Sequence, residues 1–271
     1  MARQPYTIDD LLRVMERLRD PETGCPWDLR QDFRSIVPST LEECYELAEA
    51  IEHGDFPHVA EELGDVLFQV IFYAQLGREQ GLFTFGAIVD TLVEKLLRRH
   101  PHVFAGGEIE AIADGRASVE DVKESWESIK EAERHARSRP GILADVPLAL
   151  PALPRAQKLQ RRAARVKFDW PEAGAVLAKL REEIDELEQA LAGEGAEAVR
   201  EEMGDLLFSC VNLARHLRLD AEASLRQASA RFERRFRLME TLAGEAGSTL
   251  EGMDAEALDE LWERAKGALR R

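Results

Sequence analysis

Residues 182–205 read EEIDELEQALAGEGAEAVREEMGD, and residues 42–65 read EECYELAEAIEHGDFPHVAEELGD. Both segments place two adjacent glutamates, a third glutamate and a Glu-x-x-Asp pair at identical spacings, 140 residues apart. Self-similarity at a fixed distance defines an architecture before any single motif is interpreted. The sequence therefore predicts two homologous halves, each with one copy of this acidic pattern.

Apolar residues in and around the second segment recur at the period of an α-helix. Four of them lie at steps of four, three and four: Leu180, Ile184, Leu187 and Leu191. This spacing predicts a helix with an apolar stripe on one side, which finds its partner either within the chain or across a dimer. No stretch alternates like a half-buried strand between hairpin turns. The expected fold class is all-α, built as a tandem repeat of two helical bundles.

The repeat continues beyond the acids. The basic residues of 95–99 recur at 231–235, an offset of 136, and Trp126 recurs as Trp262 at the same offset. Each half is therefore expected to contain two acidic helices, a basic helix and a short helix with a tryptophan.

Proline and glycine gather between residues 140 and 154, where they favour turns and loops. We place the domain boundary near residue 140. This gives an N-terminal domain at 1–140 and a C-terminal domain at 141–271, each of ordinary size.

Composition limits the classes of function. The chain of 271 residues is 45% hydrophobic and 32% charged, which is typical of a globular protein. Its formal net charge of −16 argues against a nucleic-acid polymer as the main partner. The sequence lacks an apolar run of the roughly 18–20 residues that span a membrane, and its start lacks the apolar core of a secretion signal. Three cysteines without metal-ligand spacing favour a reducing, cytoplasmic location.

The acidic residues fall on shared helix faces. Side chains three or four positions apart lie on one side of a helix, so Glu182, Glu183 and Glu186 converge. Glu202 and Asp205 are likewise three apart on the next helix. Two such helices packed antiparallel would bring the carboxylates together, and their mutual repulsion would require a cation.

All of these ligand candidates carry oxygen, which favours Mg²⁺, with Mn²⁺ as a substitute, over zinc. The first copy offers the same set: Glu43, Glu46, Glu62 and Asp65. The number of carboxylates suffices for more than one ion, which suits a polyphosphate substrate. The plain alternative is a solvated charged face, and two copies in register disfavour it. A di-iron bundle is disfavoured because such sites use Glu-x-x-His, whereas the position three after the glutamate is here Glu186 or Asp205 and never histidine.

The combined motifs resemble the MazG family of nucleoside triphosphate pyrophosphohydrolases, in its full-length form with two domains. The segments that carry this resemblance cover nearly the whole chain: GCPWD at 24–28, EELGDVLF at 61–68, RRHPHVF at 98–104, EEMGDLLF at 201–208 and FERRF at 232–236.

The resemblance implies an all-α bundle, Mg²⁺ dependence, a homodimer and a housecleaning role on unwanted nucleotides. It implies hydrolysis of NTPs or dNTPs between the α and β phosphates, which yields a nucleoside monophosphate and pyrophosphate. Its metal ligands map onto Glu183, Glu186, Glu202 and Asp205. Its basic residues map onto Lys179, Arg231 and Arg235, and its aromatic nucleotide contact maps onto Trp262.

General phosphoryl-transfer chemistry adds a role for Glu182. This carboxylate would orient or deprotonate the attacking water. Arg231 and Arg235, one helical turn apart, would clamp the phosphates. The alternatives are that the arginine pair faces solvent and that Trp262 belongs to the core.

The two halves differ at polar positions near the acids. Lys179 and Asn212, which could hold phosphate or sugar, correspond to Ser39 and Phe72 at the offset of 140. We expect the C-terminal domain to carry the main active site, while the N-terminal domain binds metal and turns over weakly or serves assembly. The competing hypothesis is a non-catalytic helical scaffold that senses nucleotides.

Overall fold

The computed structural model describes residues 5–113, 117–136, 141–144, 146–193 and 195–269. These residues form ten α-helices and no strand, which confirms the all-α prediction. The chain divides into two compact units, Met1–Glu133 and Arg134–Arg271. The predicted boundary near residue 140 falls outside the described residues and stays a prediction.

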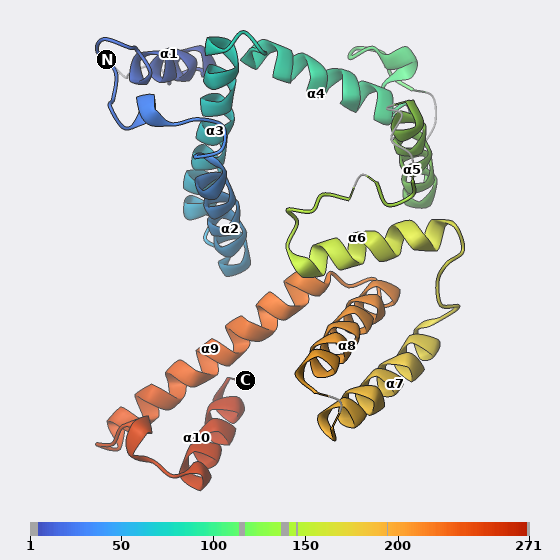
Figure 1. The fold of residues 1–271 in the computed structure, drawn as a ribbon. Helices are drawn as coiled ribbons and strands as arrows, with labels where there is room; N and C mark the ends of the chain where they lie inside the picture. Colours follow the sequence, from blue (N-terminus) through green and yellow to red (C-terminus); the bar gives the residue numbers. More distant parts are fainter. Residues whose placement is uncertain (1–4, 114–116, 137–140, 145, 194, 270–271) are drawn as a thin grey trace. The chain divides into compact units, whose positions relative to one another are not determined.

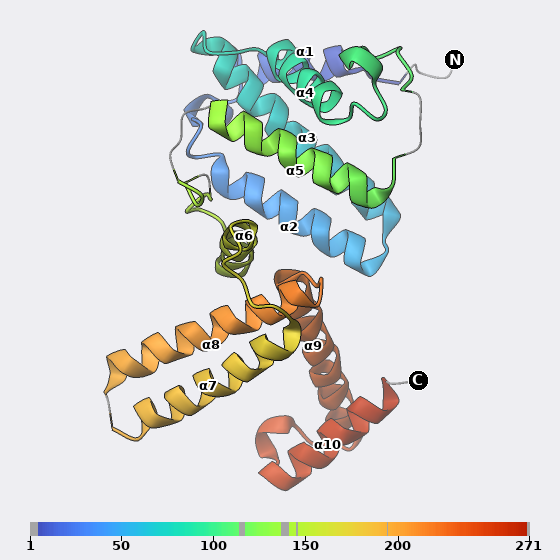
Figure 2. The same cartoon turned by 90° about the vertical axis from the view of Figure 1, so that its right-hand side faces the viewer.

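The first unit is organised around its longest helix, α3 (Figures 1 and 2). Its helices are α1 (Ile8–Leu18), α2 (Val37–His53), α3 (Phe56–Glu79), α4 (Phe85–Arg99) and α5 (Val119–Ala136), with short 3₁₀ turns at Asp28–Arg30 and Ala105–Gly107. Helix α3 contacts α1, α2 and α4. The buried core joins these elements through Met15, Ile36, Ile71, Phe72 and Leu76.

A tight turn sets α2 and α3 side by side. Gly54 ends α2 with a φ of +70°, a left-handed conformation that glycine adopts without steric cost. Asp55 then caps α3, because its side chain accepts a hydrogen bond from the His58 backbone N–H at 3.3 Å. These two residues turn the chain back, so that the acidic residues of α2 face α3.

The second unit contains α6 (Ala152–Arg165), α7 (Ala173–Leu191), α8 (Ala196–His216), α9 (Ala221–Glu245) and α10 (Ala255–Ala268), with a 3₁₀ turn at Leu250–Gly252. Helices α7 and α8 pack along each other, and α6 lies against both α8 and α9 (Figure 2). Gly195, at the start of α8, has a φ of +96° and lies in the turn between α7 and α8.

Helix α10 packs on the far end of α9, around Met239, Ala243, Leu261 and Ala265. Both views show α9 carrying α10 away from the α7–α8 pair (Figures 1 and 2). Within the described ranges, no helix has the length and apolar character needed to cross a membrane.

The apolar stripe of α7 does not face α8. The buried residues of α7 are Val176, Glu183 and Ala190, which are seven positions apart, whereas Ile184 and Leu191 are exposed. A carboxylate therefore occupies the centre of the α7–α8 contact, and part of the predicted stripe remains on the surface of the unit.

Candidate functional site

The C-terminal acidic residues meet between α7 and α8. Carboxylate oxygens of Glu183 and Glu186 from α7 and of Glu202 from α8 all lie within 4.8 Å of one another. Glu183 is only 4% exposed. Asp205 lies one turn beyond Glu202, is exposed, and is not part of this close group. The structure thus brings together three of the four predicted ligands.

Lys179 places its ammonium group next to these carboxylates. Its Nζ lies 2.6 Å from Glu182 Oε1, 3.1 Å from Glu183 Oε1 and 3.6 Å from Glu186 Oε2. The hydrogen bond to Glu182, reinforced by Glu183, raises the pKa of Lys179 above its usual range although burial opposes the charge. Glu182, the predicted water-activating carboxylate, is exposed and holds this lysine.

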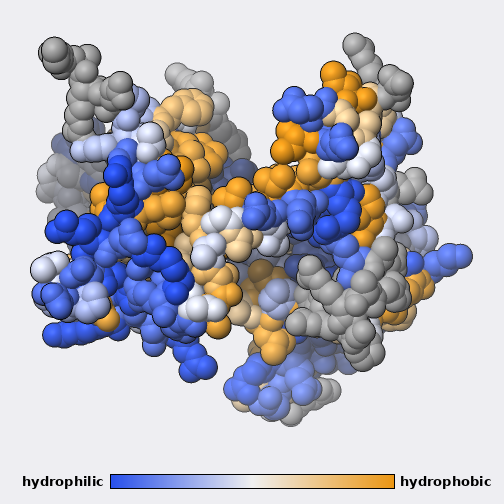
Figure 3. Space-filling model, turned by 90° about the horizontal axis from the view of Figure 1, so that it is seen from above, coloured by the Kyte–Doolittle hydropathy of each residue, from blue (hydrophilic) through white to orange (hydrophobic). Residues whose placement is uncertain are grey.

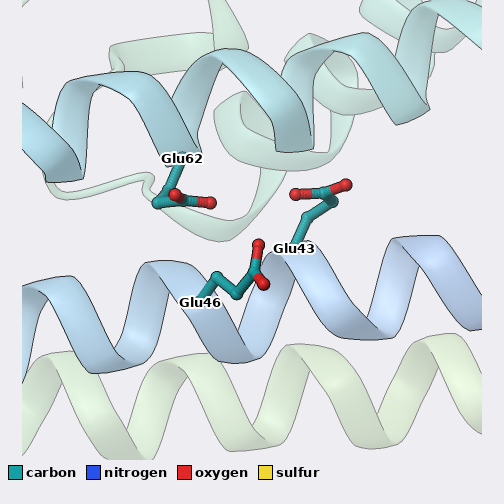
Figure 4. A group of neighbouring side chains, drawn as sticks. All are labelled: Glu43, Glu46 and Glu62. Atoms are coloured by element: carbon teal, nitrogen blue, oxygen red, sulfur yellow. The ribbon is translucent and has the colours of Figure 1, made fainter.

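The N-terminal acids form the matching group. Glu43 and Glu46 extend from α2 toward Glu62 of α3 (Figure 4). Their carboxylate oxygens also lie within 4.8 Å of one another. Burial, and then the charge of Asp65 and of the neighbouring glutamates, raises the pKa of Glu43. This cluster is crowded with like charges.

Glu62 makes one polar contact and lacks another. Its Oε1 lies 2.7 Å from His58 Nε2. Its Oε2 is buried and has no hydrogen-bond partner in the described chain. A buried carboxylate oxygen without a partner is costly, and a divalent cation between the three glutamates would satisfy it. The residues of both clusters therefore fit a hard cation with oxygen ligands.

The two candidate arginines lie on α9, and the candidate tryptophan lies on α10. Arg231 is exposed, and the guanidinium of Arg235 lies 5.7 Å from the ring centroid of Trp262. Trp262 also packs on Phe232, with ring centroids 5.3 Å apart, at the edge of the α9–α10 core. The structure therefore groups Arg235 with Trp262, on the helices that lead away from the acidic cluster.

The basic helix of the N-terminal half carries Lys95, Arg98 and Arg99 as the counterparts of Arg231, Arg234 and Arg235, and its two arginines are neutralised within the chain. Arg98 Nη2 lies 2.7 Å from Glu133 Oε1, and Arg99 also pairs with Glu133. Arg99, and then Arg98, lowers the pKa of Glu133 to about 2 although burial opposes this. Sequence reasoning missed Glu133. Its counterpart at the offset of 136 is Leu269, so comparing the two halves at this position would have revealed the additional acid.

Asn212 lies on α8 two turns beyond Asp205. Its Oδ1 accepts hydrogen bonds from Arg215 Nε at 3.0 Å and from Nη2 at 2.7 Å. At the same position of the first unit, the Phe72 side chain is 0% exposed, and the Arg19 guanidinium lies 5.3 Å from its ring centroid. The difference noted in the sequence therefore gives the second unit a polar side chain at a position where the first unit has a buried apolar one.

Comparisons with known proteins show the family of the chain. The family model of the MazG nucleotide pyrophosphohydrolase domain matches residues 31–104 and 172–239. The nucleoside triphosphate pyrophosphohydrolase of Escherichia coli (strain K12) is 48% identical over 263 residues, which cover 96% of this chain and 97% of that protein. The nucleoside triphosphate pyrophosphohydrolase/pyrophosphatase MazG of Thermotoga maritima is 43% identical over 267 residues, which cover 98% of each chain.

A solved structure of a mazG-related protein from Thermotoga maritima matches 45% of this chain and 98% of its own, with a TM-score of 0.38 and 25% identity. The two family-model regions contain both acidic clusters, and the full-length relatives match nearly end to end. The chain belongs to the MazG family of nucleoside triphosphate pyrophosphohydrolases, as a full-length form with two MazG regions.

Proposed function

We propose that the C-terminal unit is the main active site, which hydrolyses nucleoside triphosphates between the α and β phosphates with Mg²⁺. The products are a nucleoside monophosphate and pyrophosphate. The observation that carries this proposal is Lys179, whose ammonium group lies among the carboxylates of Glu182, Glu183 and Glu186. Among the residues that the structure describes, this half places a lysine beside its acidic cluster, whereas the position of Lys179 is a serine, Ser39, in the other half.

In this proposal Glu183, Glu186, Glu202 and Asp205 hold Mg²⁺, or Mn²⁺ in its place. When bound, the metal ion neutralises phosphate oxygens and lowers the pKa of water. Glu182 orients the attacking water and accepts its proton. The water oxygen bonds to phosphorus, the α–β anhydride bond breaks, and pyrophosphate leaves. Before this attack, Lys179 exchanges its contact with Glu182 for the phosphates and reduces their charge.

Three differences support the assignment to the C-terminal half. The first unit has Ser39 instead of the lysine and the buried Phe72 instead of Asn212. Its basic helix is paired with Glu133, which competes with phosphate for Arg98 and Arg99. The acids Glu43, Glu46, Glu62 and Asp65 remain metal ligands in the proposal. The N-terminal unit thus binds metal but holds a substrate poorly.

We also propose a homodimer. The α7–α8 pair exposes large apolar side chains, and others are exposed on α9. They are Leu177, Ile184, Leu191, Met203, Leu207, Phe208, Leu225, Phe232 and Phe236. Such a surface is typical of an interface. Hydrophobic side chains also reach the surface, among hydrophilic ones, on the face seen in Figure 3. Helix α9 leads away from the acidic cluster of its own chain. A second copy could instead present Arg231, Arg235 and Trp262 to that cluster.

For the dimer, we expect light scattering to give twice the chain mass of 30.5 kDa. Mixing Glu183→Gln and Arg235→Ala chains should restore part of the activity if the two groups act from different copies. A mass of one chain contradicts the dimer. A dimer without restored activity would place both groups of one site on the same copy.

The function itself is tested by product analysis with Mg²⁺ and each common NTP and dNTP. We expect a nucleoside monophosphate and pyrophosphate, and we expect chelation of the metal to abolish turnover and readdition to restore it. A diphosphate and free phosphate would contradict the cleavage position. Nucleotide binding without any product would favour the alternative, a helical scaffold that senses nucleotides.

A further inference from the structure

The second unit contains a cavity of about 610 Å³, within the size range of small-molecule sites. It lies between α6, the segment that joins α6 to α7, and α8. Its walls are largely apolar and include Phe168, Trp170 and Phe208. Lys167, which also lines it, has a φ of +64°, a conformation that non-glycine residues rarely adopt. Backbone strain of this kind concentrates at functional sites.

The cavity lies on the acidic face of α8. Asn212 lines it and follows Asp205 by seven residues, a spacing that returns to the same side of a helix. At 1.5 Å per residue, Asn212 lies roughly 10 Å along the axis from Asp205. A triphosphate held at the carboxylates can therefore extend its nucleoside along α8 toward the cavity.

The amides of Gln160 and Asn212 line the cavity together with the charged residues Lys167, Asp169 and Arg215. Gln160 is only 7% exposed, and its Nε2 donates to the Phe208 backbone carbonyl at 2.8 Å, which fixes the amide. Its Oε1 is buried and has no hydrogen-bond partner in the described chain. Asn212 turns its Oδ1 to Arg215, so its Nδ2 can donate. Aromatic walls with one amide acceptor and one amide donor suit a planar heterocycle that carries both kinds of group.

The first unit shows that the fold does not require this cavity. Phe72 occupies the position of Asn212, is fully buried, and contacts Met15, Ile36 and the other members of the core cluster. The Arg19 guanidinium covers its ring. An apolar side chain of the N-terminal half thus fills the place that corresponds to the cavity of the C-terminal half.

We infer that this cavity binds the base of the nucleotide substrate, and that Gln160 and Asn212 determine which base is preferred. Phe168 and Trp170 provide the stacking walls. Gln160 Oε1 accepts a hydrogen bond from the base, and Asn212 Nδ2 donates one. The inference rests on the proposed function, since it assigns a subsite to the same substrate. Trp262, on α10, lies outside this cavity and would contact the nucleotide elsewhere.

The first test is Asn212→Phe, which introduces the residue of the N-terminal half. We expect the KM for all NTPs to rise at least about tenfold and the affinity for the four nucleoside monophosphates to fall similarly, since the ring fills the cavity. The matched control is Cys210→Val, which also introduces the N-terminal residue but at an exposed position of α8 outside the cavity. It should leave both quantities unchanged.

The second test is Gln160→Leu, which keeps the approximate volume and removes the acceptor. We expect the ratios of kcat/KM among ATP, GTP, CTP and UTP to change by about tenfold, because the lost hydrogen bond distinguishes bases. Far-ultraviolet circular dichroism and Mg²⁺ titration confirm that each variant is folded. Asn212→Ser, which enlarges the cavity, provides a second variant at that position if Asn212→Phe does not fold, and it should also change the base ratios.

The binding and turnover measurements separate the two proposals. Wild-type hydrolysis with unchanged KM, base ratios and monophosphate affinity in the variants would overturn the cavity assignment and leave the proposed function intact. Suppose instead that the wild-type protein binds monophosphates but releases no pyrophosphate, and that Asn212→Phe loses this binding. That result would support the cavity assignment and overturn the proposed function.

Discussion

Glu183→Gln is expected to lower pyrophosphate release by about a hundredfold or more at saturating Mg²⁺. Glu183 is buried, and its carboxylate contacts both Lys179 and the other acids of the cluster. The amide keeps the shape of the side chain and loses the charge. A metal ion contributes several kcal/mol of transition-state stabilisation, and about 1.4 kcal/mol corresponds to a tenfold change in rate. The measurement is a coupled pyrophosphate assay.

Glu43→Gln is the matched control, because Glu43 is the counterpart of Glu183 in the first unit. We expect it to change turnover by less than about threefold, since the N-terminal unit has Ser39 at the position of Lys179 and the buried Phe72 at the position of Asn212. Burial, and then repulsion from the neighbouring acids, raises the pKa of Glu43. The glutamine carries no charge and avoids both costs, so the metal-free variant should unfold at a higher temperature than wild type. A large loss of activity from Glu43→Gln together with a small one from Glu183→Gln would reverse the assignment of the active half.

The fold class and the acidic clusters were accessible from the sequence because both are local properties. Helix period places Glu183 and Glu186 on one face, and a turn at Gly195 is enough to bring Glu202 opposite them. The repeat shows which acidic positions belong to the clusters, since the pattern keeps its spacing in both halves. These inferences need only the geometry of one helix and its neighbour.

The remaining features depend on contacts between residues far apart in the chain. The sequence places Leu180, Ile184 and Leu187 on one stripe, but periodicity alone does not tell which face of α7 meets α8. The structure buries Glu183 there and exposes Ile184. Likewise, the cavity forms only where α6 and the segment after it meet α8, and the helix pattern of α6 gives no sign of it.

Lys179 is expected to act in opposite directions on metal binding and on turnover. Its ammonium group lies 3.1 Å from Glu183 and 3.6 Å from Glu186, so it competes with a cation for the same oxygens. Two unit charges 4 Å apart interact by about 4 kcal/mol at the effective dielectric of a protein surface. Because the side chain is 26% exposed, solvent screens part of this energy. Removing the lysine should therefore tighten Mg²⁺ binding by about tenfold.

The substitution that tests this is Lys179→Ser, which installs the residue of the N-terminal half. Calorimetry should show the tighter Mg²⁺ binding, while kcat/KM falls about a hundredfold because the phosphates lose a charge-assisted hydrogen bond. Arg181→Ser, at an exposed position two residues further along α7, controls for the general loss of positive charge. Weaker Mg²⁺ binding with unchanged turnover would show that Lys179 only holds the carboxylates in place. Opposite changes in the two quantities require that the lysine leaves the acids and contacts the substrate during turnover.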